Sequence, residues 1–227
     1  MSTVLVIAAH PDDEILGVGG TAARRSEEGD NVYALILGEG QTSRWDAREQ
    51  AEQTAVHQLH KNTMEAARII GYSDVFFENL PDNRFDSVDL LDIVKKVEQY
   101  ITKLQPDVLY THHHGDLNID HRLTCEAVLT AARPVGSYTV KEIYQFETLS
   151  STEWNFGNKE TNFCPNVFVD IEGYLPQKLN AMKKYESELC DFPHPRSLEM
   201  LEIMAKKWGS TVGKINAEAF ELVRQIL

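Results

Sequence analysis

Short apolar runs rich in β-branched residues alternate with longer amphipathic stretches along the first two thirds of the chain. The short runs predict strands at residues 3–9, 31–38, 74–80, 107–113 and 142–147. The longer stretches predict helices at residues 17–29, about 43–70, 87–105 and around 122–132. This alternation predicts an α/β fold with a mostly parallel sheet covered by helices on both faces.

The last third of the chain has a different pattern. Residues 166–171 predict a strand, and residues 173–189, 197–208 and 217–226 predict helices that form a helical C-terminal cap. In FPHPRS (192–197), two prolines flank His194 and place it on a constrained loop. Since no linker signal is evident, we expect a single domain over residues 1–227.

Composition narrows the choice of partners. The chain has 35 Asp and Glu against 22 Lys and Arg, and its formal charge of −13 disfavours nucleic acid as a partner. Cys125, Cys164 and Cys190 are widely spaced and odd in number, which favours a reducing compartment over a disulfide framework. The apolar run of residues 4–9 is too short for a signal sequence or a membrane span. We therefore expect a cytoplasmic protein.

Two polar clusters fall where predicted strands end. AHPDDE (9–14) follows the first strand, and HHHGDLNIDH (112–121) follows DVLYT. In an open parallel sheet, ligands bind beyond the carboxyl ends of the strands, so the two clusters meet if their strands lie near each other. His10 and Asp13, on a turn fixed by proline, can reach one divalent ion, with His121 as the expected third ligand. Two imidazoles and one carboxylate suit zinc with an open position for water.

Simpler interpretations of these residues stay open. Asp12, Asp13 and Glu14 also suit the first turn of a helix, where the dipole favours negative charge. For the three consecutive histidines, a solvated loop with one hydrogen-bonded imidazole is the alternative, and for His112 it is the favoured one.

Three further residues are candidates for substrate binding. Arg44 follows the second predicted strand and suits a phosphate or hydroxyl, although a surface ion pair explains it equally well. Asp82 and Arg84 follow the third predicted strand and suit sugar hydroxyls or the acyl group. A turn-forming role is the alternative for Asp82.

The residues AHPDDE match letter for letter the hallmark of the PIG-L or LmbE-like zinc-dependent N-deacetylases, and GDLNIDHR (115–122) and LPD (80–82) resemble further family motifs. The likeness covers most of the first 150 residues. It implies a Rossmann-like three-layer sandwich, zinc held by His10, Asp13 and His121, and Asp12 as general base. The implied reaction is hydrolysis of the N-acetyl group of an amino sugar or sugar conjugate.

One position departs from the family pattern. Many members carry HxxH in the second loop, where the first histidine stabilises the oxyanion, and this chain has Asn118 there. An amide donates a neutral hydrogen bond but no full charge, so Asn118, His113, His114, His194 and the zinc ion are all candidates for that role.

Two other functions are weighed against deacetylation. A metal-dependent phosphoesterase also uses Asp and His clusters, often with two ions, but ligands for only one are evident. A sugar-binding protein with a vestigial site is disfavoured because Asp12 and every proposed ligand are present. A homo-oligomer is compatible with the resemblance.

Overall fold

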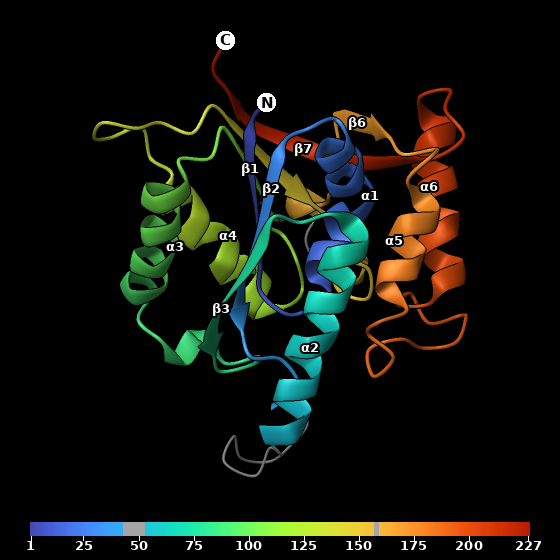
Figure 1. The fold of residues 1–227 in the computed structure, drawn as a ribbon, viewed down its shortest axis with the longest axis horizontal. Helices are drawn as coiled ribbons and strands as arrows, with labels where there is room; N and C mark the ends of the chain where they lie inside the picture. The colour runs from blue at the N-terminus through green and yellow to red at the C-terminus, as the bar shows by residue number, and fades with distance from the viewer. Residues whose placement is uncertain (43–52, 157–158) are drawn as a thin grey trace.

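A seven-stranded sheet runs through the part of the chain that the computed structural model describes, residues 1–42, 53–156 and 159–227 (Figure 1). Its strands are β1 (Thr3–Ala8), β2 (Asn31–Gly38), β3 (Asp74–Leu80), β4 (Val108–His112), β5 (Glu142–Phe146), β6 (Val167–Asp170) and β7 (Ala217–Gln225). The strand order is β3-β2-β1-β4-β5-β7-β6. The first five strands pair in parallel, and β7 pairs antiparallel with β5 and β6. The mostly parallel sheet is therefore confirmed.

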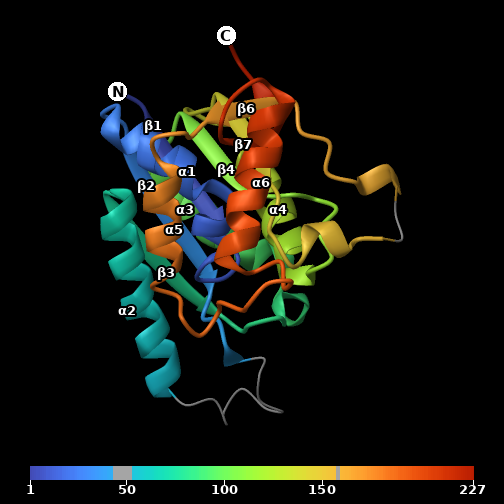
Figure 2. The same cartoon turned by 90° about the vertical axis from the view of Figure 1, so that its right-hand side faces the viewer.

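Helices cover both faces of this sheet. They are α1 (Asp13–Glu27), α2 (Gln53–Ile70), α3 (Leu90–Leu104), α4 (Ile119–Ala131), α5 (Leu175–Met182) and α6 (Leu198–Thr211). Short 3-10 helices span Phe85–Ser87, Thr152–Trp154 and Lys159–Thr161. α3 and α4 lie on one face, and α1, α2 and α5 lie on the other, with α6 beside α5 (Figures 1 and 2). The result is a three-layer α/β sandwich in which α5 and α6 form the C-terminal cap.

The central strand β1 is buried on both faces. Val4 and Val6 pack in the core under α1 and α2, while Leu5 and Ile7 pack in the core under α3 and α4. A strand covered on both faces needs apolar residues at every position, which explains the uninterrupted run at the start of the chain.

The strand order reverses direction between β1 and β4. From β1 the chain moves outward through β2 and β3, and it then returns to add β4 and β5 on the other side of β1. β1 and β4 are direct neighbours, with Val4 opposite Val108 and Val6 opposite Tyr110. The two polar clusters of the sequence thus leave adjacent strands at a topological switch point, the usual ligand position in such sheets.

The predicted helix at residues 217–226 is wrong. This segment is strand β7, inserted between β5 and β6. Ala, Glu and Leu favour a helix locally, but pairing with two neighbouring strands overrides that preference.

β7 also ties the sheet to the middle of α1. The buried carboxylate of Glu218 accepts hydrogen bonds from the backbone N–H groups of Gly20 at 2.9 Å and Thr21 at 2.7 Å. Lys178 Nζ lies 2.6 Å from Glu218 Oε1 and donates to the Leu16 carbonyl at 2.8 Å. This buried ion pair is satisfied on both sides, and it anchors the helix whose first turn carries Asp13.

Among the described residues, none of the helices combines the length and the apolar character needed to span a bilayer.

Candidate functional site

A cavity of about 240 Å³ opens beyond the carboxyl ends of β1 and β4. Segments that are far apart in the sequence line it: the turn into α1, the loop after β3, the loop into α4 and the loop before α6. Most of the lining side chains are polar or charged, among them His10, Asp12, Asp13, Asp82, Asn118, His121 and Arg196. Such a lining suits a polar ligand.

Three lining residues place one ligand atom each at the corners of a triangle. His10 Nδ1 lies 3.3 Å from Asp13 Oδ2 and 3.3 Å from His121 Nε2. His121 Nε2 lies 3.3 Å from Asp13 Oδ2. A tetrahedral zinc ion with bonds of about 2.0 to 2.1 Å sets its ligand atoms about 3.3 to 3.4 Å apart. The three side chains therefore fit three corners of a zinc tetrahedron and leave the fourth corner for another ligand.

The outer nitrogens of both imidazoles face carboxylates. His10 Nε2 lies 3.0 Å from Asp120 Oδ2 and 3.2 Å from Asp82 Oδ1. His121 Nδ1 lies 3.2 Å from Asp116 Oδ1. For the neutral rings that a metal ion requires, these partners assign the imidazole protons to the outer nitrogens, and the inner lone pairs then converge on the centre of the triangle. Asp82 was predicted to bind substrate, and its contact with His10 indicates that it orients a proposed metal ligand.

His112 supports the site from behind, and the solvated loop expected for it is wrong. The residue is fully buried, its Nε2 accepts from the Ala9 N–H at 2.9 Å, and its Nδ1 lies 3.0 Å from Thr148 Oγ1. Its ring stacks on His121 with the centroids 3.9 Å apart. Burial lowers the pKa of His112 to about 3, so it is a neutral imidazole with both nitrogens occupied.

Asp12 occupies a strained position beside the triangle. Its φ of 110° lies in the left-handed region, where a residue other than glycine costs about 1 to 3 kcal/mol. The Asp12 N–H donates to Glu14 Oε2 at 3.0 Å, and Glu14 Oε1 accepts from the Tyr185 hydroxyl at 2.5 Å. Glu14 therefore stabilises the tight turn at Asp12 between β1 and α1.

Arg196 holds the Asp12 carboxylate and was missed by the sequence analysis. Its Nη1 lies 3.3 Å from Asp12 Oδ2 and 3.3 Å from Glu188 Oε2, and its Nε donates to Ser150 Oγ at 3.0 Å. It belongs to the FPHPRS loop, in which the two prolines single out His194. In the sequence, only its position in that loop indicated a role for Arg196.

Burial disfavours the charged forms of His121, Asp13 and Asp12, and neighbouring charges oppose this effect on the pKa to different degrees. Burial lowers the pKa of His121, but the carboxylates of Asp13 and Asp116 outweigh it and raise the pKa to about 9. Burial raises the pKa of Asp13, but His121 and other imidazoles bring it well below its ordinary value. For Asp12 burial prevails and raises the pKa well above its ordinary value, although Arg196 opposes this.

Asn118 lines the cavity as the N-cap of α4. Its Oδ1 accepts from the Asp120 N–H at 2.8 Å, and its Nδ2 donates to Asn83 Oδ1 at 2.9 Å. Since the amide nitrogen carries two hydrogens, one remains after the bond to Asn83.

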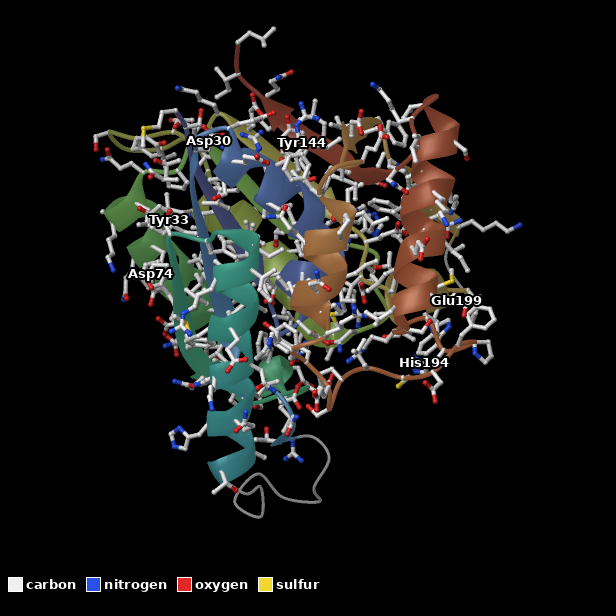
Figure 3. All side chains as sticks on the ribbon, turned by 45° about the vertical axis from the view of Figure 1, so that its right-hand side comes forward. Asp30, Tyr33, Asp74, Tyr144, His194 and Glu199 are labelled. Carbon is white, nitrogen blue, oxygen red and sulfur yellow. The ribbon has the colours of Figure 1, made fainter. Side chains whose placement is uncertain are left out.

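The structure does not bring every candidate residue to the cavity. Its described lining excludes four candidates: His113, His114, Arg84 and His194. His114 and Arg84 are exposed, and His113 is buried with its Nε2 3.4 Å from Glu221 Oε2. His194 lies on the loop that precedes α6 (Figure 3), and its Nδ1 accepts from the Arg196 N–H at 3.0 Å. Arg44 lies outside the described residues.

Comparison with solved structures gives the fold but not the reaction. GalB, the 4-carboxy-2-hydroxymuconate hydratase from Pseudomonas putida KT2440, superposes with a TM-score of 0.79 at 21% identity, covering 100% of this chain and 98% of that one. At such low identity the likeness establishes a shared architecture, and one architecture hosts different reactions.

Sequence comparison is more specific. YaiS, an uncharacterized deacetylase of Escherichia coli (strain K12), is 30% identical over 190 residues, which are 81% of this chain and 90% of that protein. The diacetylchitobiose deacetylase of Thermococcus kodakarensis (strain ATCC BAA-918 / JCM 12380 / KOD1) is 24% identical over 97% of this chain and 82% of that protein. The model of the PIG-L family, described as GlcNAc-PI de-N-acetylase, matches residues 5–132, more than half of the chain. The resemblance carried by AHPDDE is confirmed, and the chain belongs to the PIG-L family.

Proposed function

We propose that this protein is a zinc-dependent N-deacetylase that hydrolyses the acetamide of an amino sugar or amino-sugar conjugate. The observation that carries the proposal is the triangle of His10 Nδ1, Asp13 Oδ2 and His121 Nε2, with sides of 3.3 Å, beside the buried carboxylate of Asp12. The named activity of the Thermococcus kodakarensis relative supports the substrate class.

The donor set fits zinc in kind as well as in spacing. Imidazole nitrogen and carboxylate oxygen are both common zinc ligands, and three protein ligands with one open position are typical of catalytic rather than structural sites. When bound there, zinc would supply Lewis acidity, which lowers the pKa of a coordinated water to about 7 and polarises the amide carbonyl. His10, Asp13 and His121 would hold it, oriented by Asp120 and Asp116.

Asp12 is the proposed proton carrier. Its carboxylate lies next to the ligand Asp13 in the chain but outside the triangle, and Arg196 fixes one of its oxygens. A carboxylate in this position takes a proton as water attacks the amide carbon, and it then returns that proton to the nitrogen of the leaving amine. The raised pKa of Asp12 suits a group that must hold the proton between these two steps.

Asn118 is proposed to stabilise the developing negative charge on the carbonyl oxygen. It lines the cavity, and the amide hydrogen not used by Asn83 is available as a neutral donor. For His194 the structure supports a different role, because its Nδ1 accepts from the backbone of Arg196 and so shapes the loop that presents this arginine.

Metal removal tests the proposal. Protein treated with chelator and then freed of it should release no acetate from N,N'-diacetylchitobiose, and stoichiometric zinc should restore the release. A phosphate ester serves as the matched control substrate and should stay intact in both states. Acetate release that persists after complete metal removal, or hydrolysis of the phosphate ester in its place, would refute the assignment.

A further inference from the structure

Five residues on the outer side of the triangle form a closed cycle of polar contacts. His10 Nε2 lies 3.2 Å from Asp82 Oδ1, and Asn83 Nδ2 donates to the same oxygen at 3.4 Å. Asn83 Oδ1 accepts from Asn118 Nδ2 at 2.9 Å, and Asn118 Oδ1 accepts from the Asp120 N–H at 2.8 Å. Asp120 Oδ2 closes the cycle at His10 Nε2, 3.0 Å away. This contact cycle joins a proposed zinc ligand to the amide that is proposed to meet the carbonyl oxygen.

Two segments that are far apart in the sequence carry the contact cycle. Asp82 and Asn83 follow β3, whereas Asn118 is the N-cap of α4 and Asp120 lies in its first turn. Asp120 Oδ1 accepts from the Phe85 N–H at 2.9 Å and so ties α4 to the segment after β3. The bond between the Asn83 and Asn118 amides is a second connection between the same segments. Both amides therefore lie between partners whose positions are set elsewhere in the fold.

The two ends of this amide pair decide which atom of each amide faces its neighbour. An ionised carboxylate only accepts hydrogen bonds, so Asp82 requires the nitrogen of Asn83 on its side. A backbone N–H only donates, so Asp120 requires the oxygen of Asn118. Reversing either amide would place two donors or two acceptors against each other. The nitrogen of Asn118 is thus assigned to the side of Asn83, and its second hydrogen is left for a ligand in the cavity that both residues line.

The backbone around Asn83 keeps its amide in place. The Arg84 N–H donates to the Pro81 carbonyl at 3.2 Å and closes the turn that carries Asn83. Asn83 has a φ of 52°, in the left-handed region, which asparagine tolerates better than most other residues. Asparagine therefore satisfies two requirements here, since it suits the backbone of the turn and supplies both a donor and an acceptor.

We propose that Asn83 is a positioning residue for deacetylation, which holds the Asn118 amide so that its nitrogen is presented to the carbonyl oxygen of the substrate. The inference rests on the proposed deacetylase function and on the role proposed there for Asn118. In the reverse orientation, the amide would point its oxygen at the developing negative charge. The orientation set by Asn83 thus decides whether Asn118 stabilises or destabilises that charge.

Two asparagine-to-glycine variants test this role. Asn83→Gly removes the amide, and glycine adopts the positive φ without strain. The kcat should fall about tenfold with KM within about twofold of the wild-type value, because an unheld amide keeps only part of the stabilisation that one oxyanion donor gives. Asn79→Gly is the matched control, because Asn79 has a φ of 55°, is exposed and lies outside the described cavity lining. Its kcat should stay at the wild-type value, and both variants should carry as much zinc as the wild-type protein.

A combined variant separates positioning from a merely structural role. Asn118→Ala alone should lower kcat by about 10², the usual cost of removing one oxyanion donor. If Asn83 acts through Asn118, adding Asn83→Gly to this variant should change kcat by less than about twofold, since the effects of coupled residues are not additive. A further tenfold loss in the combined variant, or a wild-type kcat in Asn83→Gly alone, would overturn the inference.

A measurement on metal-free protein distinguishes the failure of this inference from that of the proposed function. In the nuclear magnetic resonance spectrum of isotope-labelled protein, the side-chain amide signals of Asn118 are identified by their loss in Asn118→Ala. They should shift in Asn83→Gly, where the amide loses its partner, and stay in place in Asn79→Gly. If this shift is seen but the zinc-loaded wild-type protein releases no acetate, the deacetylase assignment fails and the hold of Asn83 on Asn118 stands. If acetate is released but the Asn118 signals do not shift in Asn83→Gly, the inference is overturned.

Discussion

Two groups of histidines and carboxylates each take a histidine from the segment between residues 113 and 121, yet their chemistry differs. The first is the triangle of His10, Asp13 and His121, and the second joins His113, His114 and Glu221. In both groups, one ligand atom from each residue lies within 4.8 Å of the others. Proximity alone therefore does not distinguish a metal site from an ordinary polar cluster.

The neighbours of the imidazole nitrogens do distinguish them. In the triangle, Asp120 Oδ2 lies 3.0 Å from His10 Nε2 and Asp116 Oδ1 lies 3.2 Å from His121 Nδ1, so the inner lone pairs of the neutral rings point at a common centre. In the second group, the Gly115 N–H donates to His113 Nδ1 at 3.2 Å, so the proton of the neutral ring sits on Nε2 and faces Glu221 Oε2 at 3.4 Å. Burial lowers the pKa of His113, which favours that neutral form. His113 thus turns its Nε2 toward a carboxylate, and its Nδ1 lone pair already accepts from the Gly115 N–H.

Among the variants that test this difference between the two groups, the loss of a proposed ligand of the triangle should have the largest effect. In His121→Gln, acetate release should fall to background and the purified protein should carry little zinc, because one of the three proposed ligands is lost. Gln retains polar atoms between the Asp13 and Asp116 carboxylates, and circular dichroism should confirm a folded chain. Normal zinc content together with full activity in this variant would show that the triangle is not the metal site.

The next largest effect is expected where the ligands stay and the proton carrier is lost. In Asp12→Asn, kcat should fall by about 10² to 10⁴, the usual contribution of a positioned acid or base, while the zinc content stays at the wild-type value. Asn is the suitable replacement because it tolerates the positive φ of this position better than most residues. A variant that keeps both its zinc and its turnover would remove Asp12 from the mechanism.

A smaller effect is expected from Arg196, which acts through Asp12. In Arg196→Met, kcat should fall roughly tenfold with zinc retained, since a hydrogen bond to a charged group contributes about 1.5 to 3 kcal/mol and Arg196 keeps some contact with solvent. Arg196→Lys should recover part of the loss, because the ammonium restores the charge without the planar fork. Equal rates in Met, Lys and wild-type proteins would limit Arg196 to a structural role.

The sequence predicted the triangle well because its residues lie in local motifs. His10 and Asp13 share the turn after one predicted strand, and His121 follows the loop after another. Only the pairing of these two strands was needed to bring the three residues together. Arg196 and Glu221 escaped the prediction for the opposite reason. Each reaches its partner through tertiary packing, and neither stands in a local pattern that reports the contact.

The helix predicted at residues 217–226 shows the same limit in the fold. Ala217, Glu218 and Leu222 are good helix formers, but their segment has two strand partners in space, β5 and β6. Glu218 is buried, and its carboxylate accepts from backbone N–H groups of α1. A local pattern carries no information on such distant partners.

The smallest effect on activity is expected in the second histidine group, and it makes the comparison quantitative. In His113→Asn the zinc content should stay at one ion per chain and kcat/KM should change by less than about threefold, because the Nδ1 lone pair of His113 already accepts from Gly115 and its Nε2 faces Glu221. The free energy of unfolding should instead fall by about 1 to 3 kcal/mol, since the half-buried Glu221 loses the buried imidazole that faces it. Metal analysis and thermal unfolding of the same samples measure both quantities. Two zinc ions in the wild-type chain and one in His113→Asn would mean that the second group binds metal after all, and that the positions of imidazole protons are a poor guide to ligation in this fold.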